Sequence, residues 1–272
     1  SNSLIGYTIL GARELGNGLM RLKQTGLLAE STDIRPYRDG VKLSPERSIG
    51  YNLGMDYTAS PKLFFQLNLF RNDVSHLIET YNLPFNQTNG KSIFSYKNVD
   101  RVFTQGAELN INYTLNKNWR FSTGYNFLVA KDKDVVDEIK NGKLYRRDPG
   151  TGYSHLVSLS DYKGLYNRSR HTGNLNVQYK NLELDASAML TVKYRGKYGF
   201  QGINNYVDGN LILDDPREFA EGYALMNLVL CKDFGNKYSV QAGVDNILDY
   251  TQSALLPSQF GRGYFINLNF KF

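Results

Sequence analysis

The sequence lacks any long hydrophobic run. Over its 272 residues there is no window of about 18 consecutive apolar side chains, which excludes a transmembrane helix. Hydrophobic residues make up only 41% of the chain, and the mean hydropathy is −0.43. A membrane-spanning strand does not need such a run, because only every second residue of the strand faces lipid.

Cysteine and histidine are scarce. Cys231 is the only cysteine, so no disulfide within the chain and no thiolate metal site can form, and we interpret it as an inert strand side chain. The three histidines, His76, His155 and His171, are too far apart in sequence for a zinc pair. The acidic run 132–138 is interrupted by lysine and lacks the glycine of a calcium loop, which favours a solvated charged face. The sequence thus predicts no metal site and no cofactor.

The charge balance narrows the range of partners. The net charge is +6 and the pI about 9.1, but the basic residues are spread over the whole chain. Without a basic cluster we expect no nucleic-acid partner. Attraction of the basic side chains to anionic lipopolysaccharide at a bilayer surface is compatible with this composition.

Aromatic residues are abundant, with 20 tyrosines and 15 phenylalanines, and they recur with a period of two. In the last ten residues one strand face carries large apolar side chains and the other carries Asn267, Asn269 and Lys271. The apolar face consists of Tyr264, Ile266, Leu268, Phe270 and Phe272. Apolar and polar faces alternating in this way are typical of a barrel with lipid outside and a polar lumen inside.

The same alternation predicts nine strands, most of them long enough to cross a bilayer at a tilt. The facing of the seventh strand stays open, because it is apolar on both faces. The predicted strands are Ile49–Tyr57, Leu63–Arg71 with a continuation to Glu79, Val102–Thr114, Trp119–Leu128, His171–Tyr179, Leu182–Lys193, Gly222–Lys232, Tyr238–Asn246 and Gly263–Phe272.

The predicted connections alternate between short and long. Short turns with aromatic residues beside them are typical of the periplasmic edge of an outer-membrane barrel. Long loops are typical of its outer edge. The long connections are about 72–101, 129–170, 194–221 and 247–262. We therefore expect an all-β, antiparallel transmembrane β-barrel with the faces of Ile49, Tyr51 and Leu53 toward lipid. The rival class is a soluble β-sandwich or lipocalin-like binder, which would bury those faces.

Residues 1–48 are less regular than residues 49–272. Leu4–Leu10 fits a tenth strand, followed by an outer loop over Gly11–Ser48. No signal peptide is visible, since Leu4–Ala12 is short and no basic segment precedes it. An outer-membrane protein needs such a peptide, so we expect that it was removed or that the chain is a fragment. Nine or ten strands leave two alternatives, a complete small barrel or part of a larger one.

Four sequence elements together resemble TonB-dependent outer-membrane receptors. Leu43-Ser-Pro-Glu-Arg-Ser48 is similar to their L-x-P-E element, and Gly243-Val-Asp-Asn-Ile-Leu-Asp-Tyr250 is similar to the element of their penultimate strand. Gly261-Arg262 resembles their G-R step, and Phe272 matches their terminal aromatic residue. The resemblance implies that the chain is the C-terminal part of a barrel of about 22 strands. The plug domain and the TonB-contacting segment of the family have no counterpart here.

The resemblance also implies a function and partners. The expected function is active import of a bulky, scarce nutrient across the bacterial outer membrane, using energy delivered by the TonB complex through the missing N-terminal part. An iron–siderophore complex or haem is the expected ligand, with cobalamin or a glycan fragment as the runner-up. A passive porin or a structural surface barrel is the alternative. Phe270 and Phe272 resemble the signal by which outer-membrane barrels are recognised for assembly.

The connection 129–170 carries the candidate ligand-binding residues. It is rich in tyrosine and arginine, and an exposed His or Tyr can ligate haem iron. The candidates are Tyr145, Arg146, Arg147, Tyr153 and His155. Ser154 next to His155 suggests an esterase, but adjacent side chains on an extended chain point to opposite sides. We therefore predict that the protein is not an enzyme.

Overall fold

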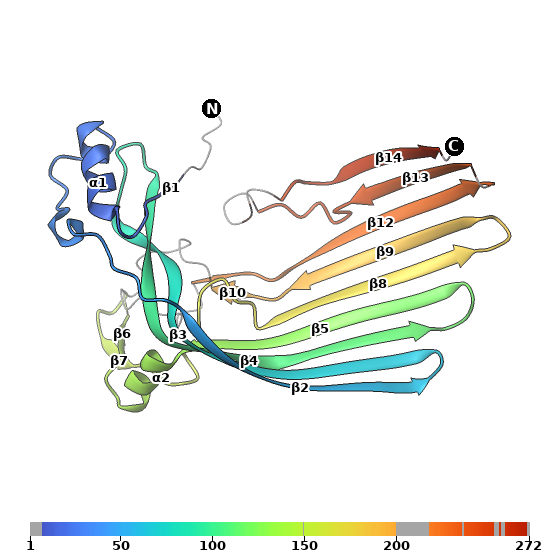
Figure 1. Cartoon of the computed structure of the whole chain (residues 1–272), viewed down its shortest axis with the longest axis horizontal. Coiled ribbons are helices and arrows are strands. Elements are labelled where there is room, and N and C mark those ends of the chain that lie inside the picture. The colour runs from blue at the N-terminus through green and yellow to red at the C-terminus, as the bar shows by residue number, and fades with distance from the viewer. Residues whose placement is uncertain are drawn as a thin grey trace. The chain divides into compact units, whose positions relative to one another are not determined.

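The structure is a computed structural model that describes residues 7–148, 150–199, 218–235, 237–252, 256 and 259–270. Its main feature is one large sheet in which nine long strands follow one another in chain order (Figure 1). These strands are β2 (Arg47–Ser60), β3 (Leu63–Asn86), β4 (Ser92–Thr114), β5 (Trp119–Asp132), β8 (His171–Asn181), β9 (Ala186–Arg195), β12 (Tyr223–Phe234), β13 (Tyr238–Asp245) and β14 (Gly263–Phe270). The nine-strand prediction is confirmed.

The sheet is an open antiparallel meander in the described part of the chain. The register is antiparallel for every pair from β5 to β14, and β2 and β14 are the two edges of the strand order. Among the described residues no helix is long and apolar enough to cross a membrane.

One face of the sheet is apolar and the other polar, as the alternation predicts. Tyr179, Ala188, Leu230, Ala242 and Ile266 form one cross-strand row by register, and all are apolar or aromatic. On the edge strands the corresponding side chains are exposed; Leu53 is 69% exposed and Ile266 73%. This arrangement suits a sheet whose apolar face is covered by lipid, whereas a soluble sandwich would bury it.

The register also fixes the facing of β12, which the sequence left open. Met226 pairs with Val192, Leu228 with Leu190 and Leu230 with Ala188, so these side chains belong to the apolar face. Asn227 and Cys231 belong to the polar face, opposite Thr191 and Ser187. Cys231 is half-buried and free, as expected for a strand side chain.

Short turns at one edge of the sheet are flanked by paired aromatic rings. The Trp119 and Tyr179 ring centroids lie 4.7 Å apart, and Tyr57 stacks on Phe65 at 6.4 Å. Tyr238 meets Phe270 edge-to-face at 5.7 Å. Such a belt matches the interfacial girdle of membrane barrels.

The boundaries of β9, β3 and β4 differ from the prediction. β9 begins at Ala186, because the Asn181 side chain accepts hydrogen bonds from the backbone N–H groups of Glu183 and Leu184, both at 3.0 Å, and folds 182–185 into the turn. β3 and β4 have 24 and 23 residues, beyond the about 9–11 that a bilayer needs, so the expected loop 72–101 is mostly a hairpin.

The first part of the chain folds as a compact unit together with residues 73–102 and 132–134. It contains β1 (Thr8–Ile9), α1 (Leu15–Gln24) and the 3₁₀ helix η1 (Arg35–Tyr37). Leu15 and Leu19 project from one face of α1 into a core with Leu28, Leu83 and Ile93. The segment Gly11–Ser48, expected as an outer loop, is therefore folded around an apolar core that it shares with Leu83 and Ile93, and its position outside the membrane stays a prediction.

The tenth strand also differs from the prediction. Thr8 and Ile9 pair in parallel with Ile93 and Phe94 of β4, whereas an up-and-down barrel strand would be antiparallel. Residues 4–6 of the predicted strand lie outside the described residues.

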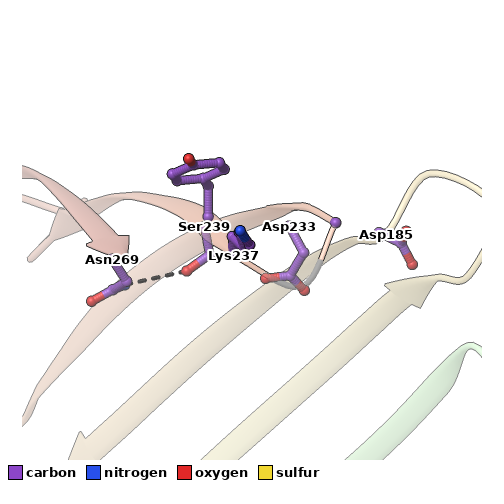
Figure 2. A pocket seen from close by; sticks show the side chains of 7 residues that line it. Asp185, Asp233, Lys237, Ser239 and Asn269 are labelled. Carbon is purple, nitrogen blue, oxygen red and sulfur yellow. Dashed lines mark hydrogen bonds between the residues drawn. The ribbon is translucent and has the colours of Figure 1, made fainter. Parts of the chain in front are cut away.

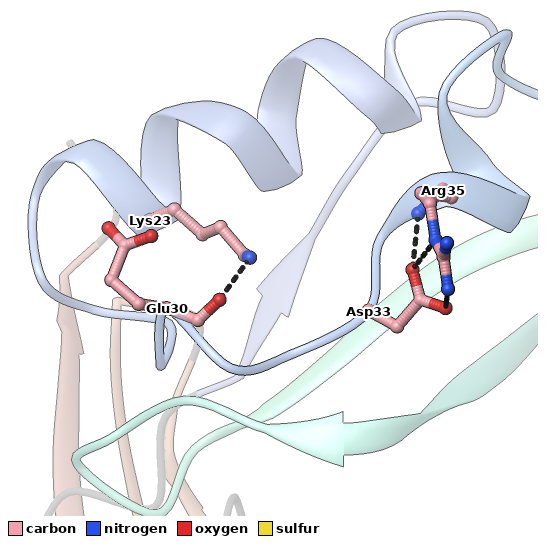
Figure 3. A network of polar contacts seen from close by, with 4 residues as sticks. All are labelled: Lys23, Glu30, Asp33 and Arg35. Atoms are coloured by element: carbon pink, nitrogen blue, oxygen red, sulfur yellow. Dashed lines mark hydrogen bonds and ion pairs between the residues drawn. The ribbon is translucent and has the colours of Figure 1, made fainter.

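Polar side chains form hydrogen bonds on the surface of this unit (Figure 3). Arg35 donates to both oxygens of the Asp33 carboxylate, at 2.9 and 2.8 Å, and its backbone N–H adds a third bond. These hydrogen bonds, the side-chain ones first, lower the pKa of Asp33 to about 2. Lys23 donates from Nζ to the carbonyl oxygen of Glu30 at 2.6 Å.

Candidate functional site

The connection between β5 and β8 is a folded element. It consists of α2 (Lys133–Lys140) and a hairpin of β6 (Tyr145–Arg147) and β7 (Ser154–Leu156). Ile139, Val157 and Tyr162 form a small buried core, packed against Val135, Val136 and Leu144. The Val157 N–H donates to the Leu144 carbonyl at 3.0 Å and ties the hairpin to that core. The hairpin is therefore held in place by apolar packing.

The structure brings the five predicted ligand-binding residues together on this hairpin. Arg146 lies directly opposite His155, so the two side chains share one face. Tyr145 and Arg147 belong to the other face, opposite Leu156 and Ser154. Tyr153 closes the turn, where its carbonyl accepts a hydrogen bond from the Asp148 N–H at 2.8 Å.

The hairpin presents large aromatic surfaces to solvent. Tyr145 is 55% and Tyr153 73% exposed, although tyrosine usually buries part of its ring. Arg147 and His155 are exposed as well, and Arg146 is half-buried. Exposed rings beside cationic side chains suit a ligand that is both aromatic and anionic.

Two carboxylates adjoin these cations. The backbone N–H groups of Thr151 and Gly150 donate to Asp148 and lower its pKa, with a smaller contribution from His155. Ser158 donates to Asp161 from its hydroxyl at 2.7 Å and from its backbone N–H at 2.9 Å, which lowers the pKa of Asp161. Both carboxylates are thus satisfied locally, mainly by hydrogen bonds.

The structure places Ser154 and His155 on opposite sides of β7. Their cross-strand partners are Arg147 and Arg146 respectively, on the two faces of the hairpin. A serine nucleophile must reach its histidine base directly, and this arrangement prevents that.

The other two histidines and the C-terminal aromatic residues do not belong to the β6–β7 hairpin. His171 Nδ1 and the Tyr125 hydroxyl are 2.6 Å apart on β8 and β5. His76 has a positive φ of 57° within β3, and its carbonyl accepts a hydrogen bond from the Asn98 amide at 2.7 Å. Phe270 is 57% exposed on β14, whereas Phe272 lies outside the described residues.

The acidic run 132–138 is engaged in contacts within the protein. Arg101 donates from Nε to Asp134 at 2.7 Å, and Lys133 pairs with Asp73 at 2.5 Å. In the described part of the chain no group of three or more His, Cys, Asp or Glu side chains is arranged to hold a metal ion.

A polar groove on the polar face of the sheet was not predicted as a site. It has a volume of 540 Å³ and is lined by residues of β4, β5, β8 and β9. Glu108 and Lys193 bring opposite charges to it, and Asn110, Asn174 and Asn176 bring amides. The Asn176 side-chain oxygen accepts a hydrogen bond from Thr191 at 3.0 Å. The recurrence of asparagine at every second position was the signal in the sequence.

A second polar cavity, of 340 Å³, lies at the short turns (Figure 2). Asp185, Asp233 and Lys237 contribute charges, and the Asn269 amide donates to the Ser239 hydroxyl at 3.4 Å. Its opening at the turn edge separates it from the β6–β7 hairpin, which belongs to a long connection at the opposite strand ends.

Comparison with known proteins identifies relatives over most of the chain. A family model described as "TonB dependent receptor-like, beta-barrel" matches residues 16–247. A search of curated protein sequences found no match.

Solved structures share the fold at low sequence identity. The copper transporter OprC is 18% identical with a TM-score of 0.58, and 85% of this chain covers 32% of it. The ferric-catecholate import receptor Fiu from E. coli K12 is 19% identical with a TM-score of 0.52, at 90% and 30% coverage. A variant of the ferric enterobactin receptor PfeA from Pseudomonas aeruginosa is 20% identical with a TM-score of 0.54, at 86% and 32% coverage. The chain thus spans about a third of the length of the structures it matches.

Proposed function

Because this chain belongs to the TonB-dependent receptor-like β-barrel family, we propose that it forms the C-terminal wall of an outer-membrane active-transport receptor. Members of this family are transporters, not enzymes. The observation that carries the proposal is the two-faced nine-stranded sheet, with short turns at one edge and long folded connections at the other. In this proposal the remaining strands and the plug belong to the longer protein, and the plug contacts TonB.

We place the short turns in the periplasm and the connections 129–170 and 194–221 outside the cell. Residues 200–217 of the second connection lie outside the described residues. The difference in length supports this direction, because outer-membrane barrels have short periplasmic turns and longer extracellular loops.

For the ligand, an iron–siderophore complex is favoured, and haem is the alternative of the same chemical character. The β6–β7 hairpin supports this choice, because it carries Arg146 and His155 on one face and Arg147 with the exposed Tyr145 ring on the other. Catecholate siderophores and haem both carry negative charge on an aromatic framework, which cations and rings recognise together.

The test is ligand binding by the full-length receptor. Replacing Arg146 and His155 together with alanine should weaken binding of a ferric catecholate by about 10- to 100-fold, as expected for losing two contacts to an anion. The matched control replaces Lys140 and Lys143, two exposed cations of the same connection. Ferric hydroxamate, haem, cobalamin and copper are titrated in parallel. Equal loss in both variants would show that only net charge matters.

Growth assays separate the receptor from a porin. A deletion strain complemented with the gene should grow on the bound iron source only when TonB is present. Uptake that persists without TonB would identify a passive pore. Unchanged growth of the deletion strain on haem and on every siderophore tried would remove iron from the proposal.

A further inference from the structure

The apolar face of the sheet has a hollow near the short-turn edge. It has a volume of 390 Å³ and spans β8, β9, β12 and β13. Its floor is made of small residues: Ala188 pairs with Tyr179 and Leu230, and Ala186 pairs with Asn181 and Lys232. Because alanine lies between larger neighbours in both rows, a depression opens in a surface that otherwise carries bulky side chains.

A lysine stands at the rim of this hollow. Lys232 belongs to the apolar face, since it pairs with Ala186 on β9 and Val240 on β13. A cation on the lipid face of a barrel is costly at mid-membrane and tolerated near the headgroups. Its ammonium group is directed to the turn, where it donates to the Leu184 carbonyl and lies 5.4 Å from the Phe234 ring centroid.

The Lys232 charge has no acidic partner within the part of the chain that the structure describes. In that part of the chain its ammonium group contacts a neutral carbonyl and an aromatic ring. An ammonium group has three donors, so two stay available for another acceptor. A negatively charged oxygen of a lipid headgroup can accept these two hydrogen bonds.

We propose that the hollow binds one phospholipid with an anionic headgroup from the periplasmic leaflet. An acyl chain lies over Ala186 and Ala188 beside Leu230, and the phosphate accepts from Lys232. The apolar lining and the single unpaired cation at its rim together select a lipid with a negatively charged headgroup. The inference rests on the proposed outer-membrane location and orientation but not on any transported ligand.

Native mass spectrometry of the full-length receptor in detergent tests this site, with phosphatidylglycerol as the probe. Wild type should retain one phosphatidylglycerol more strongly than phosphatidylcholine. Lys232→Gln should weaken retention about fivefold, the effect of one basic residue at an anionic surface. Ala188→Leu, which fills the hollow, should weaken retention of the acyl chain while leaving the charge in place.

Matched variants control for charge and for bulk. Lys237→Gln removes a turn lysine that lies in the polar cavity of Figure 2, and Ala224→Leu adds bulk on the apolar face far from the hollow. Both should retain the lipid as wild type does, and circular dichroism should show an intact sheet in all four variants. Excess inorganic phosphate should not displace the lipid.

Several results would overturn the site. These are equal retention of phosphatidylcholine, unchanged retention in both Lys232→Gln and Ala188→Leu, or displacement by phosphate alone. If the receptor dimerises and Ala188→Leu disrupts the dimer, the hollow binds a second copy of the chain and not a lipid. Since the assay contains no siderophore, such failures leave the transport proposal standing, whereas a receptor absent from the outer-membrane fraction would refute the proposed location.

Discussion

The side-chain amide of Asn246 donates to the carbonyl oxygen of Phe260 at 3.0 Å and joins the two ends of the connection between β13 and β14. The same amide donates to the Tyr250 carbonyl at 2.9 Å, and its oxygen accepts from the Tyr250 N–H at 3.0 Å. Arg262 adds a second link, from Nη2 to the Ile247 carbonyl at 2.7 Å. The two motifs around Asn246 and Arg262 are therefore parts of one hydrogen-bond network.

Asn246→Ala should destabilise the barrel by about 2–4 kcal/mol, because a side chain that is only 4% exposed loses its partners. Asn246 also has a φ of 50°, a left-handed conformation that alanine resists. Asn246→Gly accepts this φ, so the difference between the two variants measures backbone strain. Equilibrium unfolding by urea in lipid vesicles gives both values.

Asn267→Ala is the control for the Asn246 variants. Asn267 is an exposed amide on β14 that donates to Gln241 at 3.3 Å. Its removal should change the free energy of unfolding by less than about 0.5 kcal/mol. Similar losses of unfolding free energy in the Asn246 and Asn267 variants would contradict the structural role of this hydrogen-bond network.

The tip of the β6–β7 hairpin should respond to acid. The folded pKa of Asp148 is lowered, so its stabilising bonds are complete above the unfolded pKa of about 3.9 and disappear as the pH falls through the folded value. Protection of the Gly150 and Thr151 amides from hydrogen exchange should therefore be constant from about pH 5 to 8 and decline below about pH 4.

Asp148→Asn tests this assignment. The amide oxygen still accepts from both N–H groups but carries no titrating charge, so the hairpin should form at neutral pH and lose its acid transition. A transition of the wild-type hairpin above about pH 5 that Asp148→Asn abolishes would show that the Asp148 pKa is raised instead.

The strands were predictable because each one keeps its apolar face over many residues. Apolar side chains recur at every second position of β2, namely Ile49, Tyr51, Leu53, Met55 and Tyr57, and this periodicity requires no knowledge of distant contacts. The turn at 182–185 was missed for the same reason. Leu182 and Leu184 continue the apolar period, and the Asn181 hydrogen bonds that form the turn depend on three-dimensional geometry.

The unit around α1 was not predictable as a folded element. Its core joins Leu15 and Leu19 to Leu83 and Ile93, and these residues are far apart in sequence. For the hairpin, composition identified the right segment, but only the strand register shows that Arg146 lies opposite His155. The hollow at Ala188 likewise depends on which residues become neighbours across strands.

The direction of the barrel can be measured by labelling intact cells. A cysteine at Lys140, exposed at the end of α2, should react with a membrane-impermeant maleimide. A cysteine at Lys117, in the turn between β4 and β5, should react only after lysis. Cys231→Ser removes the background thiol. Labelling at Lys117 on intact cells, with none at Lys140, would invert the proposed orientation.

The C-terminal strand should matter more for assembly than for the stability of the finished barrel. Phe270 is 57% exposed and meets the Tyr238 ring edge-to-face, so Phe270→Ala should cost no more than about 1.5 kcal/mol in the folded state. If Phe270 and Phe272 form the assembly signal, Phe270→Ala and deletion of Phe272 should both lower the amount of folded receptor in the outer membrane, by more than this loss of stability explains. Asn269→Ala, on the polar face of the same strand, is the control, and we expect it to assemble at wild-type levels. Folded receptor is counted on unheated gels of the outer-membrane fraction. Equal yields for the Phe270 and Asn269 variants would show that the aromatic residues act only as lipid-facing side chains.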